Sequence, residues 1–204
     1  MSLNTHKLSY YISKAKSSNG SKFDKKIRIA LLSSFTINGL EETLRVLCFQ
    51  NKIDCKTYVG NYNQYNQEIL NKDSKLYKFK PDITVLIFDT RNFLGDLFFS
   101  PYAISSKKRG DFVNNKTVEI QELVNTFSKN SESKLIISNL AIPTYSPYGI
   151  YEAKADFGLQ TMVTKFNENL IQFSKNNQSI YLYNFNQFVT KYGEPNVFDY
   201  KQYF

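Results

Sequence analysis

The sequence predicts an α/β protein in which a five-stranded parallel sheet lies between two layers of helices. Five short apolar segments alternate along the 204-residue chain with helical patterns, which is the order of successive βαβ units. The first segment, residues 27–32, is apolar almost throughout, as is typical of a strand whose two faces are both covered by helices. We therefore expect a three-layer α/β/α sandwich of the flavodoxin-like kind.

The chain before the first strand is expected to form a helix and a linker. Residues 5–16 carry apolar side chains at helical spacing, and the small polar residues that follow break the pattern. We expect a helix and a linker over residues 1–22 and a single α/β domain over residues 23–204. His6, the only histidine, falls in the extension, where a catalytic base is not expected.

The first half of the domain follows the expected alternation. After the first strand, Leu40, Leu44 and Leu47 recur three or four residues apart and predict a helix. Residues 54–59 form the second strand. The polar and aromatic residues 61–70 are expected to lead through a loop into a short helix.

The second half repeats this alternation. Residues 83–88 and 135–137 are apolar runs with β-branched members and predict the third and fourth strands. Between them, apolar side chains spaced three, four or seven residues apart predict a long helix over residues 106–129. A second amphipathic pattern spans residues 159–173 and precedes the fifth strand, residues 180–183.

The composition limits the classes of partner. A formal net charge of +8 favours an acidic partner, which could be nucleic acid, an anionic protein or a phosphorylated small molecule. The lysines are scattered, and no motif of a known nucleic-acid-binding module occurs, so we expect no nucleic-acid partner. A general bias towards Asn, Lys and Tyr would also account for the charge. The apolar runs are too short to span a bilayer and no signal peptide is present, so we expect a cytoplasmic protein with no membrane partner.

No pattern for a metal or a cofactor is found. Cys48 and Cys55 have no CxxC spacing and no further cysteines to complete a metal site, so we expect two reduced thiols in the core. A glycine-rich phosphate loop is also missing, since Gly39 stands alone after the first strand. We therefore expect no metal and no cofactor.

Polar side chains follow three of the predicted strands at the point where each strand ends. Because the carboxyl ends of parallel strands share one edge of a sheet, these side chains should converge on a site. The candidate nucleophile in this set is Ser34. The candidate substrate-binding residues are Ser33, Thr36, Asn38, Asp89, Arg91, Asn92 and Asn139.

Each of these assignments has an alternative. A serine nucleophile needs a base, and without a suitable histidine that base would have to be a carboxylate or come from a partner. Ser34 and Thr36 could instead cap the following helix, where these residue types are preferred. Asp89 and Arg91 could bind an anion such as a phosphate or a carboxylate, or they could pair with each other.

The order of the polar clusters resembles that of the SGNH/GDSL hydrolases. Ser34 stands in the block that carries the Gly-Asp-Ser nucleophile in that family, and Asp199 stands where the Asp-x-x-His block would begin. Gln202 takes the place of the histidine. The resemblance implies an SGNH-like fold for residues 23–204, with Ser34 and Asp199 as the catalytic pair.

A closer resemblance is to the N-terminal domain of FkbH-like proteins, which belong to the haloacid-dehalogenase superfamily, subfamily IIIC. It is carried by residues 29–36, by residues 58–70 with the run Asn-Tyr-Asn-Gln-Tyr, and by residues 74–82. The Tyr-Gly pair at residues 192–193 and the Phe-Asp-Tyr run at residues 198–200 fit the same family. A generic α/β pattern does not require the run Asn-Tyr-Asn-Gln-Tyr, so the middle block is fairly specific.

This resemblance implies a function. In FkbH-like proteins the domain precedes a phosphatase-type domain, and the family is implied in moving a glyceryl group from a phosphorylated glycerate onto an acyl carrier protein in polyketide or surface-polysaccharide biosynthesis. The Asp-x-Asp-x-Thr motif of the phosphatase-type domain does not occur in this chain. We therefore expect a non-catalytic domain that binds or positions a substrate or an acyl carrier protein for a phosphatase-type domain or a separate partner. The alternatives are an SGNH-type esterase or acyltransferase using Ser34, and a structural or oligomerisation domain.

Overall fold

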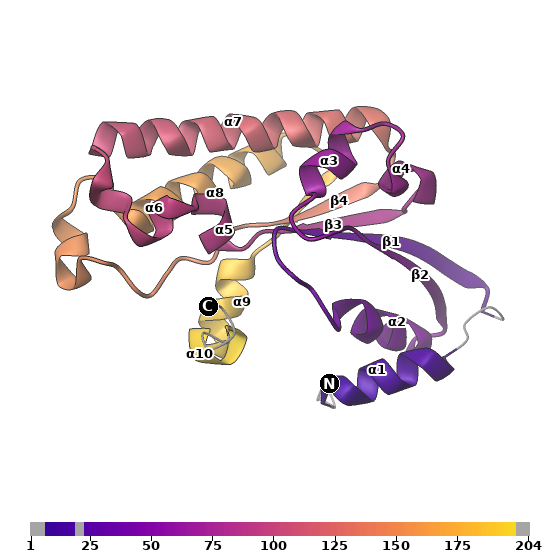
Figure 1. The fold of residues 1–204 in the computed structure, drawn as a ribbon. Coiled ribbons are helices and arrows are strands. Elements are labelled where there is room, and N and C mark those ends of the chain that lie inside the picture. The colour runs from indigo at the N-terminus through magenta and orange to yellow at the C-terminus, as the bar shows by residue number, and fades with distance from the viewer. Residues whose placement is uncertain (1–6, 19–22, 199–204) are drawn as a thin grey trace.

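The computed structural model describes residues 7–18 and 23–198, and it contains the five-stranded parallel sheet that the sequence predicts (Figure 1). The strands lie in the order β2-β1-β3-β4-β5, which is the flavodoxin-like order. Each observed strand lies within two residues of its prediction at both ends. The strands are β1 (Lys25–Ser33), β2 (Ile53–Val59), β3 (Ile83–Ile87), β4 (Lys134–Ser138) and β5 (Ile180–Tyr183).

One face of the sheet is fully covered by helices (Figure 1). Leu86 of β3 and Leu135 and Ile137 of β4 point to this face and are completely or almost completely buried. They pack in one hydrophobic core with large side chains such as Phe88, Phe127 and Phe166. The covering helices are α3 (Tyr65–Leu70), α4 (Lys75–Phe79), α7 (Ser106–Asn130) and α8 (Leu159–Lys175).

The opposite face carries helices at its two sides, which completes the three layers (Figure 1). The helix α1 (Leu8–Ser17) packs on α2 (Leu40–Gln50), and α2 lies over β2. On the other side, α9 (Phe185–Tyr192) and α10 (Glu194–Val197) follow β5. The third layer is therefore divided, and the middle of this face is less well covered than the sequence pattern predicts.

Several short helices follow β3 and β4 and were not predicted. They are α5 (Thr90–Leu94), α6 (Asp96–Phe99) and the 3₁₀ helices η1 (Pro101–Ala103) and η2 (Gly149–Lys154). Elements of this length span too few residues to show a hydrophobic period, so the sequence predicts only polar and aromatic connections there. None of the helices in the two described parts of the chain is both long and apolar enough to cross a membrane.

The two cysteines are free, as expected, but they are only half-buried rather than in the core. Cys48 lies on α2 and Cys55 on the neighbouring strand β2. Partial burial is the largest of the effects that raise the pKa of Cys55, to about 12, so this thiol stays protonated at neutral pH.

Candidate functional site

The carboxyl edge of the sheet brings three of the predicted polar segments together. The hydroxyl oxygen of Ser34 accepts a hydrogen bond from the backbone N–H of Asp89 at 2.8 Å, and the side-chain amide of Asn92 donates to the Ser34 carbonyl at 2.7 Å. The backbone N–H of Phe88 donates to the Ser138 hydroxyl at 2.9 Å. Hydrogen bonds between side chains and backbone groups thus link the ends of β1, β3 and β4, which the parallel topology predicts to lie at one edge.

Ser34 is enclosed by these contacts. Only 3% of Ser34 is exposed, and Asp89 beside it is also buried. The Asp89 carboxylate accepts the backbone N–H of Asn92 at 2.9 Å and so caps the first turn of α5. The side chains of Ser34, Asp89 and Asn92 therefore all hold the loop at the end of β3 against the end of β1.

Neither Ser34 nor Thr36 caps the helix that follows β1, so that alternative is wrong. The N-cap of α2 is Gly39, which has a φ of 86° and offers no side chain to the helix end. Thr36 and Asn38 instead lie in the connection to α2, where they line two hollows. The Ser33 hydroxyl donates to the Phe35 carbonyl and shapes the start of this connection.

Asn139 belongs to a second set of hydrogen bonds, at the ends of β4 and β5. Its side-chain amide donates to the Asn184 side chain at 3.0 Å, and its side-chain oxygen accepts the backbone N–H of Asn186 at 3.0 Å. Asn167 of α8 binds both the N–H and the carbonyl of Leu140. Sequence analysis did not single out Asn184 and Asn186, although polar residues directly after a predicted strand were the signal used elsewhere.

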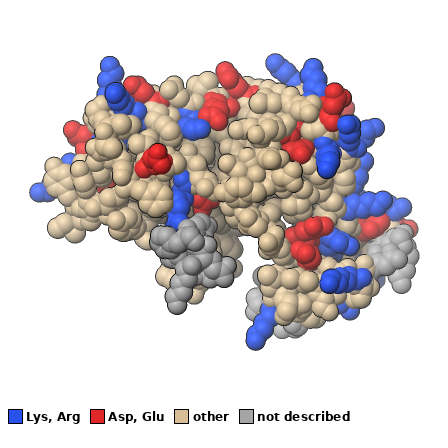
Figure 2. Space-filling model, viewed as in Figure 1, with Lys and Arg blue, Asp and Glu red and all other residues tan. Residues whose placement is uncertain are grey.

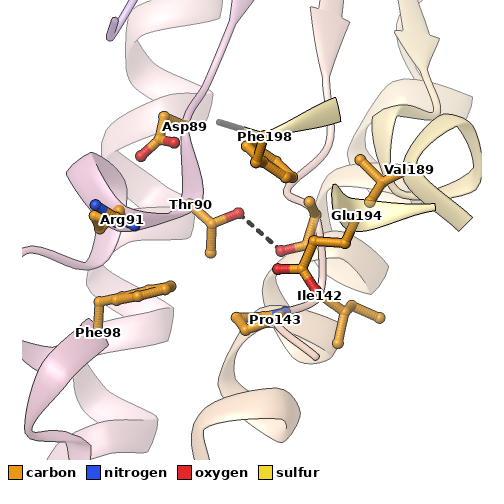
Figure 3. A pocket seen from close by; sticks show the side chains of 10 residues that line it. Asp89, Thr90, Arg91, Phe98, Ile142, Pro143, Val189, Glu194 and Phe198 are labelled. Atoms are coloured by element: carbon orange, nitrogen blue, oxygen red, sulfur yellow. Dashed lines mark hydrogen bonds between the residues drawn. The ribbon is translucent and has the colours of Figure 1, made fainter. Parts of the chain in front are cut away.

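A small cavity lies beside this edge, between α5, α6 and the C-terminal helices (Figure 3). Its volume is about 30 Å³, which is comparable to the space of one water molecule. The Thr90 hydroxyl donates to the Ala141 carbonyl at 2.8 Å across its wall. The other lining residues are Asp89, Arg91, Phe98, Ile142, Pro143, Val189, Glu194 and Phe198.

Arg91 lies at this cavity with its guanidinium 5.6 Å from the centre of the Phe98 ring and 5.8 Å from that of Phe99. This is the distance of a cation–π contact. Pairing of Arg91 with Asp89 and binding of an anion by the two side chains both stay predictions.

Two larger hollows flank the connection between β1 and α2. One has a volume of about 440 Å³ and is lined by Ser33, Thr36 and Asn38 together with Leu8 and Ile12 of α1. The other, of about 480 Å³, lies over the less covered face of the sheet and is mainly apolar. Both are within the size range of ligand sites, about 300–1,000 Å³.

An unpredicted structure beside the carboxyl edge is an aromatic lobe formed by α6, η1, η2 and residues 144–148 (Figure 1). Tyr102 and Tyr148 stack with their ring centres 3.7 Å apart. The guanidinium of Arg109, buried at the start of α7, lies 4.9 Å from the Tyr102 ring. Arg109 also donates to four backbone carbonyls on both sides of the lobe, those of Pro101, Ile104, Asp156 and Phe157.

Glu152 joins the same lobe from η2. Its carboxylate accepts hydrogen bonds from the Tyr102 and Ser146 hydroxyls and from the Gln160 backbone N–H. Partial burial alone would raise the pKa of Glu152, but these hydrogen bonds and the positive charge of Arg109 outweigh it and hold the pKa below its ordinary value of 4.5. The carboxylate is therefore charged at neutral pH and connects the two halves of the lobe.

The outer surface of the lobe is apolar and aromatic. Ile150 is 99% exposed, and the neighbouring side chains of Tyr145, Tyr148 and Tyr151 are exposed as well. Exposed lysines lie on the adjoining elements, at Lys154 of η2 and at Lys107 and Lys108 of the first turn of α7. The exposed apolar side chains, together with these lysines of the adjoining elements, are called the lobe surface below.

Two predicted features fall outside the described residues. These are Asp199, the proposed catalytic partner of Ser34, and His6. Within residues 7–18 and 23–198, no group of three His, Cys, Asp or Glu side chains is placed to hold a metal ion.

The geometry does not show to which protein family the chain belongs, and comparison with known families does. The family model of the FkbH N-terminal domain matches residues 28–204. The chain belongs to this family. Comparison with curated proteins found no match.

A solved structure shares the fold of this chain. The chain is similar to the N-terminal part of the protein BF1531 from Bacteroides fragilis, which contains a phosphatase domain and was crystallised with Mg. The TM-score is 0.80 at 20% sequence identity, over 98% of this chain. The match spans 50% of the BF1531 chain, so this chain covers about half the length of that structure.

Proposed function

We propose that this FkbH-type domain is non-catalytic and that it binds an acyl carrier protein, or a small anionic substrate, and positions it for a phosphatase-type partner. The reaction served would be glyceryl or acyl transfer in polyketide or surface-polysaccharide biosynthesis, in the cytoplasm. The observation that carries the proposal is the lobe surface beside the carboxyl edge. The BF1531 neighbour, which contains a phosphatase domain, supports the choice of partner.

The surroundings of Ser34 support a binding role over a chemical one. Its hydroxyl is buried and already accepts the N–H of Asp89, and no histidine occurs in the described residues to act as a base. An esterase would need a rearrangement here, and Asp89 or Asp199 would have to serve as the base.

The lobe surface has the features of a protein-binding site. Contiguous exposed apolar side chains on a soluble protein mark interaction surfaces, and aromatic residues contribute strongly to binding. The lysines beside them would attract an acidic protein and orient it, which raises the rate of encounter more than the affinity. Positive and negative side chains are both spread over the face shown in Figure 2, so the general charge of +8 alone does not select this surface.

The test is a calorimetric titration of the chain with an acyl carrier protein that bears a phosphopantetheine arm. We expect binding that weakens about tenfold when Lys107, Lys108 and Lys154 are all changed to Glu, a loss of about 1.4 kcal/mol. The matched control reverses the charge of three exposed lysines at the opposite edge of the sheet, Lys25, Lys129 and Lys134.

The control triple variant should bind the carrier protein as the wild type does, apart from a small effect of net charge. Equal weakening in the two triple variants would show that only the overall charge matters and would contradict a role for the lobe surface. No binding by the wild-type chain would contradict carrier-protein recognition altogether.

A further inference from the structure

We propose that the less covered face of the sheet is the surface on which a phosphatase-type domain docks. The docking surface is the apolar groove of about 480 Å³ between α2 and α9. The identity of the occupant rests on the proposed function, whereas the need for an occupant follows from the sheet itself.

The sequence of β3 is typical of a strand that is covered on both faces. Thr84 and Leu86 point to the covered face and are completely buried. The alternating residues Ile83, Val85 and Ile87 point to the other face and are only half-buried. Parallel sheets are almost always covered on both sides, and their strands then show continuous apolar runs. β3 therefore has the apolar run of a strand buried on both faces, but within the described residues helices cover only one of its faces completely.

Burial decreases along a single row of side chains across this face. Leu31, Val85, Ile136 and Tyr181 are neighbours in the strand register, and all belong to the less covered side. Leu31, beside α2, is 2% exposed, Val85 and Ile136 are half-buried, and Tyr181 at the far strand is 53% exposed. The helices α1 and α2 thus cover the side of β1 and β2, and the side chains of β3 and β4 between α2 and α9 are less well covered.

The open area forms a groove rather than a flat patch. Figure 1 places α1 and α2 at one side of this face and α9 and α10 at the other. Among the described lining residues, Thr36, Asn38 and the hydroxyl of Tyr183 provide the polar side-chain groups. The other lining residues are Leu31, Phe35, Ile37, Leu40, Leu44, Val85, Ile87, Ile136 and Phe185.

A convex domain fits this groove better than a second copy of the chain does. A two-fold dimer brings the same surface of each copy together, so two concave grooves would face each other without filling. A domain that follows or accompanies this one is the natural source of a convex partner, because the chain matches only half of the BF1531 structure, which also contains a phosphatase domain. The apolar lining is typical of a permanent contact.

The experiment places a charge in the groove and measures docking. The chain is titrated with the phosphatase-type domain of an FkbH-like protein from the same organism, as wild type and as the Val85→Lys variant. We expect the variant to bind at least about tenfold more weakly, because the lysine would leave a charge buried without a partner. The matched control is Val118→Lys on the outer surface of α7, where the valine is 51% exposed.

A second variant tests the same groove in case Val85→Lys does not fold. Tyr183→Glu changes an exposed side chain at the rim of the groove and should also weaken docking while the thermal unfolding of the chain stays cooperative. Equal binding by all four proteins would overturn the proposal, since the domain would then dock elsewhere. Absence of binding by the wild type would overturn the proposal too. It would also be overturned if light scattering showed that the chain alone forms a dimer and that Val85→Lys disrupts this dimer.

The acyl-carrier-protein titration separates this inference from the proposed function. Val85→Lys should bind the carrier protein as the wild type does, because the lobe surface does not include Val85. If carrier binding is present and docking in the groove is absent, only the groove proposal fails. If the wild-type chain binds the phosphatase-type domain through the groove but does not bind the carrier protein, only the carrier-binding part of the proposed function fails.

Discussion

At the scale of single residues, the hydroxyl of Ser34 holds two strand ends together. Its oxygen accepts the N–H of Asp89 from a loop 55 positions further along the chain, and both residues are buried. A buried N–H that loses its acceptor costs more free energy than the hydrogen bond contributed, because no water replaces the partner. Ser34 therefore has a structural role whether or not it also has a chemical one.

This role predicts the effect of Ser34→Ala on stability. The substitution leaves the Asp89 N–H without its acceptor and should lower the free energy of unfolding by about 1–3 kcal/mol in urea denaturation. The control is Ser128→Ala, an exposed position on α7, where a change within about 0.5 kcal/mol is expected. Equal stability of Ser34→Ala and the wild type would mean that the hydroxyl does not support the strand ends.

Sequence analysis could locate these residues but not their contacts. A polar residue after an apolar run marks the end of a parallel strand, which placed Ser34, Asp89 and Asn139 at one edge of the sheet. Their partners are backbone groups and side chains from distant segments, such as Asn184 and Asn186 for Asn139. Such pairings depend on how loops fold back, and no local spacing encodes them.

At the scale of elements, the long periodic segments were predicted and the short ones were not. The strands and α7 agree with their predictions within two residues, because a buried strand or a 25-residue amphipathic helix repeats its pattern several times. The aromatic lobe had no such signal. It is held by Arg109, which lies in a basic run at the start of α7 where an exposed side chain would be the usual expectation.

The lobe should respond to acid through Glu152. The pKa of this carboxyl is below 4.5 in the folded chain, so its stabilising effect is complete above that pH and is lost as the pH falls through the folded pKa. We expect thermal unfolding from about pH 6 to about pH 3 to show a loss of stability in the wild type that is smaller in Glu152→Gln.

The same variant should also be less stable than the wild type at neutral pH, because it loses the charged hydrogen bonds to Tyr102 and Ser146. Superimposable pH profiles for the two proteins would show that Glu152 does not connect the two halves of the lobe. Glu122→Gln, at an exposed position of α7, serves as the control for removing one carboxylate.

At the scale of the whole molecule, the fold class and its family were accessible from the sequence, and the surfaces were not. Alternation of strands and helices predicts the three layers, and the blocks at residues 58–70 and 74–82 indicate the FkbH family that the comparison shows. The apolar runs of β3 and β4 indicate burial on two faces but do not say what provides it. The groove and the lobe surface became visible only once the helices were placed.

The central claim is that this domain acts by binding and that Ser34 carries out no nucleophilic chemistry. The most direct measurement is labelling with a fluorophosphonate probe, which reacts with activated serines, together with turnover of short p-nitrophenyl esters. We expect no labelling of Ser34 and no turnover above that of folded Ser34→Ala protein. Labelling and turnover that are present in the wild type and lost in the folded variant would contradict the claim and would require a base at Asp89 or Asp199.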